Sequence, residues 1–326
     1  SEVQGNIADG IKYVNNSPIK SSTQGFTDSL LTAGKGHLLL TLKIPLENVD
    51  ATNLTGAYKV SNGIIYANEQ IGLPELNNIN GTLNFTESNL NAQNISAEVF
   101  GSPAKFSLKT QANKGIVISA YGRVNDASIK KLAPNIVTNS LQGSADWASE
   151  ISVRAPLIDI SLKSNLVGMA ITLPAPFNKA ANEAMSLSID KKQVSLDKDS
   201  VTLNLGKIFS ANILRSALTN DLIIERGDIG INMPAITPLA PGLSVHAKLD
   251  SLDADEWLTL LNQRESVSSI NKTSTTPFVI NKTDLAIQKL IIFGRRINAL
   301  KLSAESNNVG YKMAINSLEM TGDVQW

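Results

Sequence analysis

The side chains with the widest chemical range in this chain are its two histidines, His37 and His246. A histidine can act as a general base, or it can bind a metal ion through its neutral imidazole. Both fall on the polar face of an alternating strand pattern, and neither is accompanied by a nucleophile elbow or another local catalytic motif. We therefore interpret both as solvated surface residues, with a metal ligand as the less favoured alternative.

Two closely spaced carboxylate pairs, Asp197/Asp199 and Asp253/Asp255, have the residue types that glycosidases use as acid and base. The first pair belongs to a lysine-rich turn that contains Lys191, Lys192 and Lys198. The second pair stands where a helix is expected to begin, so both pairs have a structural explanation. The Gly-Lys-Gly triplet at 34–36 lacks the spacing and the following Ser or Thr of a phosphate loop. The sequence therefore predicts no enzyme and no cofactor.

The composition limits the partners of the chain. Lysine plus arginine and aspartate plus glutamate balance at 29 each, and aromatic residues make up only 5%, so nothing indicates nucleic-acid binding. Cysteine is absent, which excludes disulfides and thiolate metal sites. No apolar run reaches the ~18 residues of a membrane span. The chain opens on a serine without a leader, and we expect it to be a fragment of a longer protein.

Alternating apolar and polar residues are the main structural feature of the sequence. Residues 158–162 and 185–190 alternate with period two, which is typical of a strand with one apolar and one wet face. A Leu-Pro-Ala-Pro sequence at 173–176 separates them, and proline cannot donate to a sheet ladder. Many further short strands recur between Gly, Asn and Pro turns. The pattern predicts a mainly β fold built as an antiparallel meander.

The expected domain organisation is one elongated β segment over 1–326. Its sub-units are a first strand run at 36–125, a helical connector at 126–138, a second strand run at 139–250, and a helix with C-terminal strands at 251–326. The connector carries Asp126 as a candidate cap, and the second helix is expected over 253–264 with Asp253 as its N-cap. A loop is expected at 233–242, which contains three prolines, and a polar linker at 266–276.

The alternating aliphatic residues leave two interpretations open. In one, the apolar faces pack against each other as a sandwich core, which periodicity alone favours because burial against protein is commoner. In the other, an elongated, twisted antiparallel sheet curls so that its inner aliphatic face lines an open groove for an apolar ligand. A closed core would make the protein a structural or scaffolding component, and an enzyme acting on envelope glycans is a more distant alternative.

Several stretches resemble the AsmA-like family of bacterial envelope proteins, and within it the YhdP branch. The sequence LVGMAITLPAPFNK at 166–179 resembles the family's Gly, apolar strand, Leu-Pro-x-Pro and Lys pattern. SLDADEWLTLL at 251–261 resembles its helix start, and FGRRINALKL at 293–302 with GDVQW at 322–326 resembles its C-terminal strands. LPELNNINGTLNF, within the stretch 54–124, also fits. The residues before 36 match poorly.

This resemblance implies a periplasmic segment of a protein that is anchored to the inner membrane by a part absent from this chain. It implies an open β groove that conducts phospholipid between the inner and outer membranes, with acyl chains as partners and no catalytic residues. The inward positions of the strands then become the expected groove lining, and a one-residue error in register would reverse each of them. The predicted lining residues are Leu38, Leu40, Leu42, Leu83, Phe85, Ile158, Ile160, Leu162, Met185, Leu187, Ile189, Val201, Leu203, Leu205, Leu300 and Leu302.

Overall fold

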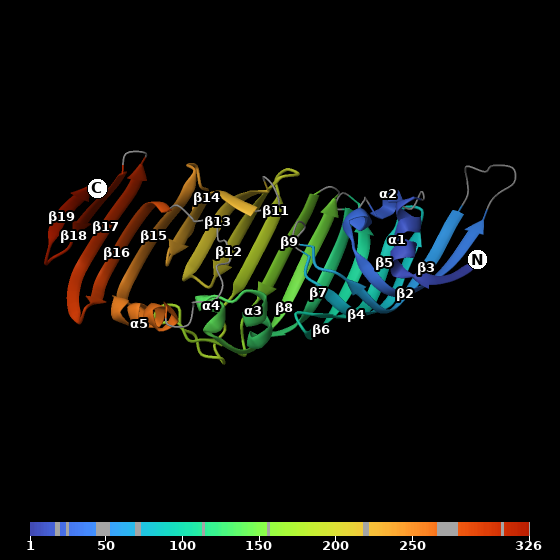
Figure 1. Ribbon diagram of the computed structural model, residues 1–326, viewed down its shortest axis with the longest axis horizontal. Coiled ribbons are helices and arrows are strands. Elements are labelled where there is room, and N and C mark those ends of the chain that lie inside the picture. The colour runs from blue at the N-terminus through green and yellow to red at the C-terminus, as the bar shows by residue number, and fades with distance from the viewer. Residues whose placement is uncertain are drawn as a thin grey trace. The chain divides into compact units, whose positions relative to one another are not determined.

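The fold is mainly β, as predicted. The computed structural model describes residues 1–16, 20–23, 26–43, 53–68, 73–112, 115–154, 157–217, 222–265, 280–307 and 310–325. Within these residues, 19 strands form one mixed sheet that does not close into a barrel, with short helices between some of the strands (Figure 1). The linker expected at 266–276 and the final residue, Trp326, lie outside the described residues.

Contacts divide the chain into two compact units, residues 1–139 with 143–167 and residues 140–142 with 168–326. The strands of the first unit are β1 (Glu2–Asn6), β2 (Thr32–Lys43), β3 (Asn53–Ile65), β4 (Leu76–Thr86), β5 (Leu90–Val99), β6 (Ser102–Gln111), β7 (Gly115–Asn125), most of β8 (Leu141–Arg154) and β9 (Leu157–Ser164). Its helices are α1 (Ile7–Asn15), α2 (Lys20–Thr23), η1 (Phe26–Ser29), α3 (Asp126–Leu132) and α4 (Ile136–Asn139). The division into sub-units that the sequence suggests stays a prediction.

The second unit includes a short three-residue strand near its start and contains one longer helix. Its elements are β10 (Met169–Ile171), β11 (Leu187–Gln193), β12 (Lys198–Leu205), β13 (Phe209–Ala217), β14 (Leu222–Ile231), β15 (Gly242–Asp253), α5 (Ala254–Glu265), β16 (Ile280–Ile292), β17 (Arg295–Asn307), β18 (Gly310–Asn316) and β19 (Thr321–Gln325). The alternation expected from 185 onward therefore starts as a strand only at Leu187, and Met185 lies just before β11.

The first unit is the antiparallel meander that the sequence predicts. Each strand from β1 to β9 pairs antiparallel with the next strand in the chain. The turn between β5 and β6 shows how local sequence makes this possible, because Phe100 and Gly101 have φ angles of 52° and 68°. Two consecutive positive φ angles are what a two-residue type I′ hairpin turn requires.

The second unit departs from the expected antiparallel order. Strand β15 pairs parallel to both β14 and β16, while β11–β14 and β16–β19 are antiparallel runs. The reason lies in the connections, since parallel neighbours need a long crossover. The predicted proline-rich loop returns the chain across β13, where Ser210 Oγ donates to the Met233 carbonyl and Asn212 Nδ2 donates to the Ala235 carbonyl.

The two predicted helices are present, with one change of cap. In α5, Asp253 Oδ1 accepts hydrogen bonds from the Asp255 and Glu256 amides at 3.0 and 3.2 Å, so it is the predicted N-cap. The connector consists of α3 and α4. Its N-cap is Asn125, whose side chain accepts from the Ser128 amide, so the prediction of Asp126 as the cap was wrong by one residue. Asp126 occupies the first turn, where the helix dipole also favours a carboxylate.

Candidate functional site

A continuous aliphatic face runs across the strands of the first unit. Strand register places one side chain of each strand directly opposite one of the next. One such row, from β2 to β9, is Leu38, Tyr58, Leu83, Ala92, Leu108, Ile118, Ile151 and Ile160. Phe85, Leu90, Ile116, Val153 and Ile158 form the buried part of the same cluster. We call these residues, with Leu40, Leu42, Leu54 and Leu162 on the same side, the first aliphatic face.

The predicted lining residues of this unit therefore share one side of the sheet. Leu38, Leu40, Leu42, Leu83, Phe85, Ile158, Ile160 and Leu162 all belong to the first aliphatic face. Most of them are only partly buried, and Leu42 is 49% exposed. The reverse side of the same strands carries exposed polar residues, among them Lys59, Asn84, Asn91, Lys109, Ser119 and Lys163. The sheet is thus amphipathic across its thickness.

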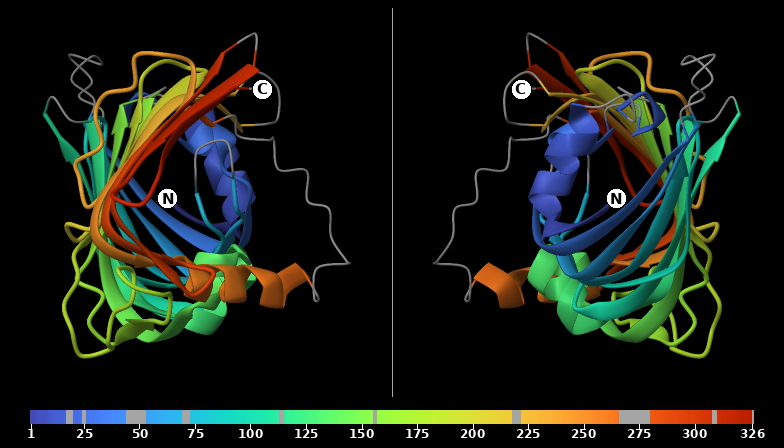
Figure 2. Two further views of the ribbon diagram at one scale, coloured as in Figure 1. Left: turned by 90° about the vertical axis from the view of Figure 1, so that its left-hand side faces the viewer. Right: turned by 90° about the vertical axis from the view of Figure 1, so that its right-hand side faces the viewer.

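Helix α1 lies on part of the first aliphatic face. Ile7 is 7% exposed, and Val14 and, from η1, Phe26 pack against the cluster. The helix backbone lies close to β3 at this point, because a Cβ atom added to Gly10 would be 2.6 Å from the Tyr58 hydroxyl oxygen. Burial, with a smaller contribution from the Asp9 charge, raises the pKa of Tyr58. Figure 2 shows the helix on the inner side of the bend in the neighbouring blue strands.

The sequence interpretation missed this helix. Residues 1–35 have little apolar periodicity, and the side chains of α1 acquire a buried face only when strands much later in the chain are assembled. The one available indication was Ile11–Val14, because the spacing of Ile7, Ile11 and Val14 matches one face of a helix.

The second unit has an aliphatic face of its own. One row across its strands is Leu187, Leu205, Phe209, Ile231, Ala247, Leu285, Leu302 and Ile315. We call this row, with Ile189, Val201, Leu203, Ala211, Ile213, Val245, Ile287 and Leu300 on the same side, the second aliphatic face. Seven predicted lining residues belong to it: Leu187, Ile189, Val201, Leu203, Leu205, Leu300 and Leu302. Met185 precedes β11 and approaches Gly206 at the end of β12.

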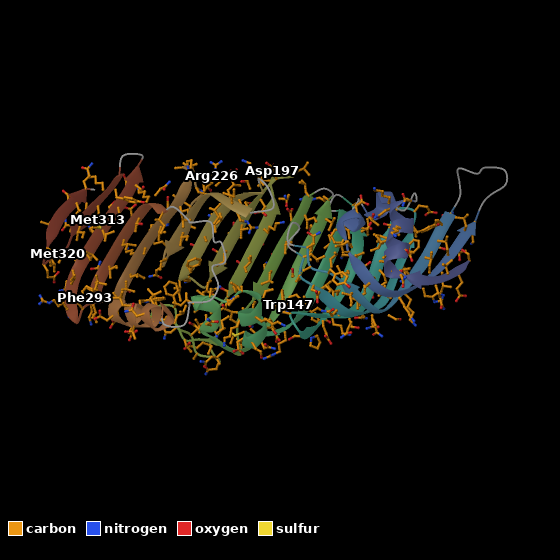
Figure 3. All side chains as sticks on the ribbon, viewed as in Figure 1. Trp147, Asp197, Arg226, Phe293, Met313 and Met320 are labelled. Atoms are coloured by element: carbon orange, nitrogen blue, oxygen red, sulfur yellow. The ribbon has the colours of Figure 1, made fainter. Side chains whose placement is uncertain are left out.

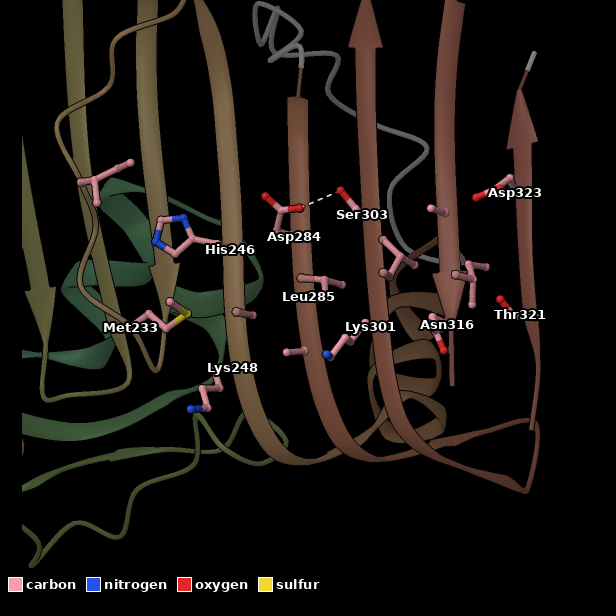
Figure 4. A pocket seen from close by; sticks show the side chains of 16 residues that line it. Met233, His246, Lys248, Asp284, Leu285, Lys301, Ser303, Asn316, Thr321 and Asp323 are labelled. Carbon is pink, nitrogen blue, oxygen red and sulfur yellow. Dashed lines mark hydrogen bonds between the residues drawn. The ribbon is translucent and has the colours of Figure 1, made fainter. Parts of the chain in front are cut away.

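The reverse side of the second unit is polar. The row that follows the same register is Ser188, Asn204, Ser210, Gly230, His246, Asp284, Ser303, Ala314 and Asp323. A depression of about 760 Å³ lies mainly over this side, between the loop residues Met233 and Ile236 and strands β15–β19 (Figure 4). Ser303 Oγ donates to Asp284 Oδ1 across it.

Both histidines contact a carboxylate rather than a metal-type cluster. His37 Nε2 lies 2.7 Å from Glu2 Oε1, and His246 Nδ1 lies 3.5 Å from Oδ2 of Asp228, which is 1% exposed. The other ring nitrogen of His246 is 3.2 Å from the Pro234 carbonyl oxygen. Among the described residues, no group of three His, Asp or Glu side chains is arranged to hold a metal ion.

The carboxylate pairs are used in structural hydrogen bonds. Asp197 accepts from the Ser195 hydroxyl, which lowers the pKa of Asp197, while Asp199 pairs with the Arg215 guanidinium. Asp253 caps α5, and Asp255 accepts hydrogen bonds from the backbone of the β16–β17 turn. Asp253 and Asp255 both line a depression of about 740 Å³ beside α5, where each accepts hydrogen bonds from backbone amides and so has a structural role.

Three of the stretches that carry the family resemblance meet in the second unit. Phe177 packs edge-on against Trp257 of α5, with ring centroids 5.7 Å apart. The Asp255 carboxylate accepts from the Phe293 and Gly294 amides at 2.6 and 2.8 Å. Lys179, 3% exposed, donates through Nζ to the Met169 and Ala180 carbonyl oxygens, and burial lowers the pKa of its amine. The first two of these contacts attach α5 to the loop after β10 and to the β16–β17 turn.

Comparisons with known proteins identify the family of the chain. A family model described as "YhdP protein" matches residues 1–326. The intermembrane phospholipid transporter YhdP of Escherichia coli (strain K12) is 23% identical over 273 residues, which cover 81% of this chain and 21% of that protein. The chain thus spans about a fifth of the length of this relative. No solved structure matches. Within the described residues, no helix is long and apolar enough to cross a membrane. The chain belongs to the YhdP family.

Proposed function

We propose that this chain binds phospholipid acyl chains on its two aliphatic faces and conducts them as part of a longer transport protein. The observation that carries the proposal is the continuity of the aliphatic rows. In each unit, strand register aligns apolar side chains on successive strands, from β2 to β9 and from β11 to β18, while the reverse side is mostly polar. Many of these aliphatic side chains are only partly buried, so they offer apolar surface to a ligand.

The energetics of acyl-chain burial suit such a surface. Each methylene group removed from water contributes ~0.8 kcal/mol, so covering about eight methylenes of one chain contributes roughly 6 kcal/mol. This stabilisation depends on apolar area and needs no specific residue at any position. A ligand can therefore move along the face without passing a deep local minimum, which favours conduction over tight storage.

The relative supports the biological setting. The Escherichia coli relative is named an intermembrane phospholipid transporter, and we extend this activity to the present chain. In this proposal the chain is a periplasmic segment, carries lipid between inner and outer membranes, and is attached to the inner membrane by a part of the protein outside this sequence. It acts without catalysis or a cofactor, since transfer needs no covalent bond to change.

The alternative is a scaffold whose apolar faces form a closed core. The scaffold is favoured by the fully buried residues of the two aliphatic faces, such as Ile116, Val153 and Ile287, which are 2%, 0% and 2% exposed. A closed core would also bury their neighbours in the same rows. Leu83, Ile151 and Leu203 are instead partly exposed, which favours the conduit.

The deciding experiment is native mass spectrometry with lipid extraction on the purified chain. Leu83→Asp and Leu203→Asp place a charge on the two aliphatic faces, while Asn84→Asp and Asn204→Asp place the same charge on the reverse side of the same strands. We expect phospholipid to copurify with the wild type and both Asn variants, and to be lost from folded Leu variants. A lipid-free wild type, with Leu variants that unfold, would instead establish the scaffold.

A further inference from the structure

Helix α1 and the 3₁₀ turn η1 cover one end of the first aliphatic face, next to β2 and β3 (Figure 2). Val14 of α1 and Phe26 of η1 pack against the same buried cluster as Leu38 and Tyr58, and Ile7 is 7% exposed. These two elements therefore occupy part of the surface that the proposed function assigns to acyl chains. A helix face and an acyl chain cannot cover the same side chains at the same time.

The elements between β1 and β2 are joined to one another by polar contacts of their own. Thr27 Oγ1 donates to Asn15 Oδ1 at 2.6 Å, which connects η1 to α1. Lys20 Nζ lies 3.0 Å from Asp28 Oδ2, which connects α2 to η1. We call α1, α2 and η1 together the helical segment. It can leave the strands as one body, because these contacts move with it.

The helical segment is also tethered at both ends. Before it, β1 pairs with β2 over Glu2–Asn6, and the amino group of Ser1 donates to the Leu40 carbonyl oxygen at 2.7 Å. After it, β2 begins at Thr32. A segment held in this way stays beside the first aliphatic face when its apolar contacts are lost, so it can return to the same place.

The closest approach of the helix to the strands is at Tyr58. A Cβ atom added to Gly10 of α1 would be 2.6 Å from the Tyr58 hydroxyl oxygen, and one added to Gly36 of β2 would be 1.8 Å from the same atom. The hydroxyl end of the ring thus lies between the helix backbone and β2, in space that two glycines leave open. Apolar contact is non-directional, so an acyl chain offers these strands the same kind of stabilisation as the helix face.

We propose that the helical segment is a displaceable plug, and that an acyl chain reaches the surface over Leu38 and Tyr58 only when α1 has moved off it. This inference rests on the proposed function and adds a closed state to one end of the first aliphatic face. A lipid that binds only the open state shifts the equilibrium toward that state. The plug in turn weakens lipid binding there by the fraction of molecules in which α1 is docked.

The test places one cysteine on α1 and one on β2 of the 326-residue chain, which has none of its own. The variant is Gly10→Cys with Gly36→Cys and Tyr58→Ala. Because both Cβ positions lie within 2.6 Å of one oxygen atom, removing the ring brings the thiols within the ~3.5–4.5 Å Cβ separation of a disulfide. The rate at which the thiols pair under a mild oxidant then reports how often α1 is docked.

The lipid added is dioleoylphosphatidylglycerol, in the Leu203→Asp background, so that native mass spectrometry counts lipid on the first aliphatic face. At saturating lipid we expect pairing to slow by roughly tenfold, as a docked fraction reduced to one-tenth would give. By linkage, the oxidised protein should bind this lipid more weakly than the reduced protein. Thr41→Cys with Thr55→Cys is the matched control, because these residues are opposite each other on the reverse side of β2 and β3, and their pairing should not respond to lipid.

The outcomes separate the plug from the proposed function. Bound lipid that leaves the pairing rate unchanged would overturn the plug while the acyl-chain surface stands, and so would equal binding by the oxidised and reduced proteins. Equal slowing in the control pair would also overturn it, because lipid would then be acting on the oxidant. If the thiols of α1 and β2 do not pair even without lipid, α1 is not docked on β2 and the plug falls. Absence of bound lipid in the wild type would overturn both proposals.

Discussion

Phe177 and Trp257 meet edge-to-face, with their ring planes at 89°. The first residue belongs to the proline-containing loop after β10, and the second belongs to α5, more than seventy positions later. Such pairs contribute about 0.5–1.5 kcal/mol beyond the area they bury. The contact joins two motifs that lie far apart in the sequence.

Replacing Trp257 with alanine should loosen α5. Because Trp257 is partly exposed, we expect a loss of about 2 kcal/mol in the free energy of unfolding, below the cost of a fully buried tryptophan. Hydrogen exchange of the α5 amides should accelerate first. Leu258→Ala is the control, because its side chain is 36% exposed and should cost much less. Equal losses in both variants would contradict the role of the ring pair.

The Asp255 carboxylate should hold the β16–β17 turn in place. It accepts from the Phe293 and Gly294 amides, and Phe293 itself is 80% exposed, so its side chain contributes little to fixing the turn (Figure 3). Asp255→Asn removes the charge and one acceptor, and we expect roughly tenfold faster exchange of these two amides. Glu256→Gln changes the charge at an exposed neighbour and serves as the control. Unchanged exchange in Asp255→Asn would show that the turn is fixed by its own backbone.

Alternation in the sequence was sufficient to predict the side of the sheet on which most aliphatic residues lie. Leu83 and Leu203 each lie on the opposite side from the polar residues that flank them, because the ladder forces successive side chains to opposite sides. Alternation also places Lys191 on the same side of the sheet as Ile189. The sequence interpretation nevertheless treated Lys191 as part of a solvated turn, because it lies in a lysine-rich stretch. The burial of Lys191 comes from β12 and β13, which a local pattern does not include.

Strand direction could not be predicted in the same way. Alternation has the same appearance in a parallel and an antiparallel strand, so nothing local distinguishes β15 from its neighbours. Its direction follows from the length of the connections before and after it. Likewise, the position of α1 depends on Tyr58 and on the close approach that Gly10 permits, which only the assembled strands reveal.

Displacing α1 should uncover more of the first aliphatic face. Gly10→Val would place side-chain atoms against the Tyr58 hydroxyl, and we expect α1 to detach while the strands stay folded. Because the chain has no cysteine, a single Leu38→Cys gives a clean reporter, and its thiol labelling should accelerate several-fold in the Gly10→Val background.

Two further variants make this result specific. Gly5→Val adds the same side chain where nothing lies within 4 Å of the new Cβ, and labelling of Leu38→Cys should stay at its original rate. Adding Tyr58→Phe to Gly10→Val removes the hydroxyl and should restore part of the protection. If the thiol of Leu38→Cys is labelled equally fast in the protein that keeps Gly10, α1 does not cover this part of the first aliphatic face.

Lys179 should make stability depend on alkaline pH. Burial lowers the pKa of its amine below the ordinary value of 10.5. Between the lowered value and 10.5, the unfolded chain holds a proton that the folded chain has lost, so the free energy of unfolding rises with pH across this window. Below the window both states are protonated, and the cost of the buried charge is present in full.

The measurement is the difference in unfolding free energy between the wild type and Lys179→Met as pH increases toward 10.5. The difference between the two proteins cancels the contributions of the other groups that titrate at alkaline pH. Tyr58 is one of them, and its raised pKa makes the free energy of unfolding fall as pH rises. We expect the wild type to gain stability relative to the variant over the window. Lys192→Met removes an exposed lysine and should give a flat difference. A flat difference for Lys179→Met as well would mean that the carbonyl oxygens of Met169 and Ala180 compensate the buried ammonium fully.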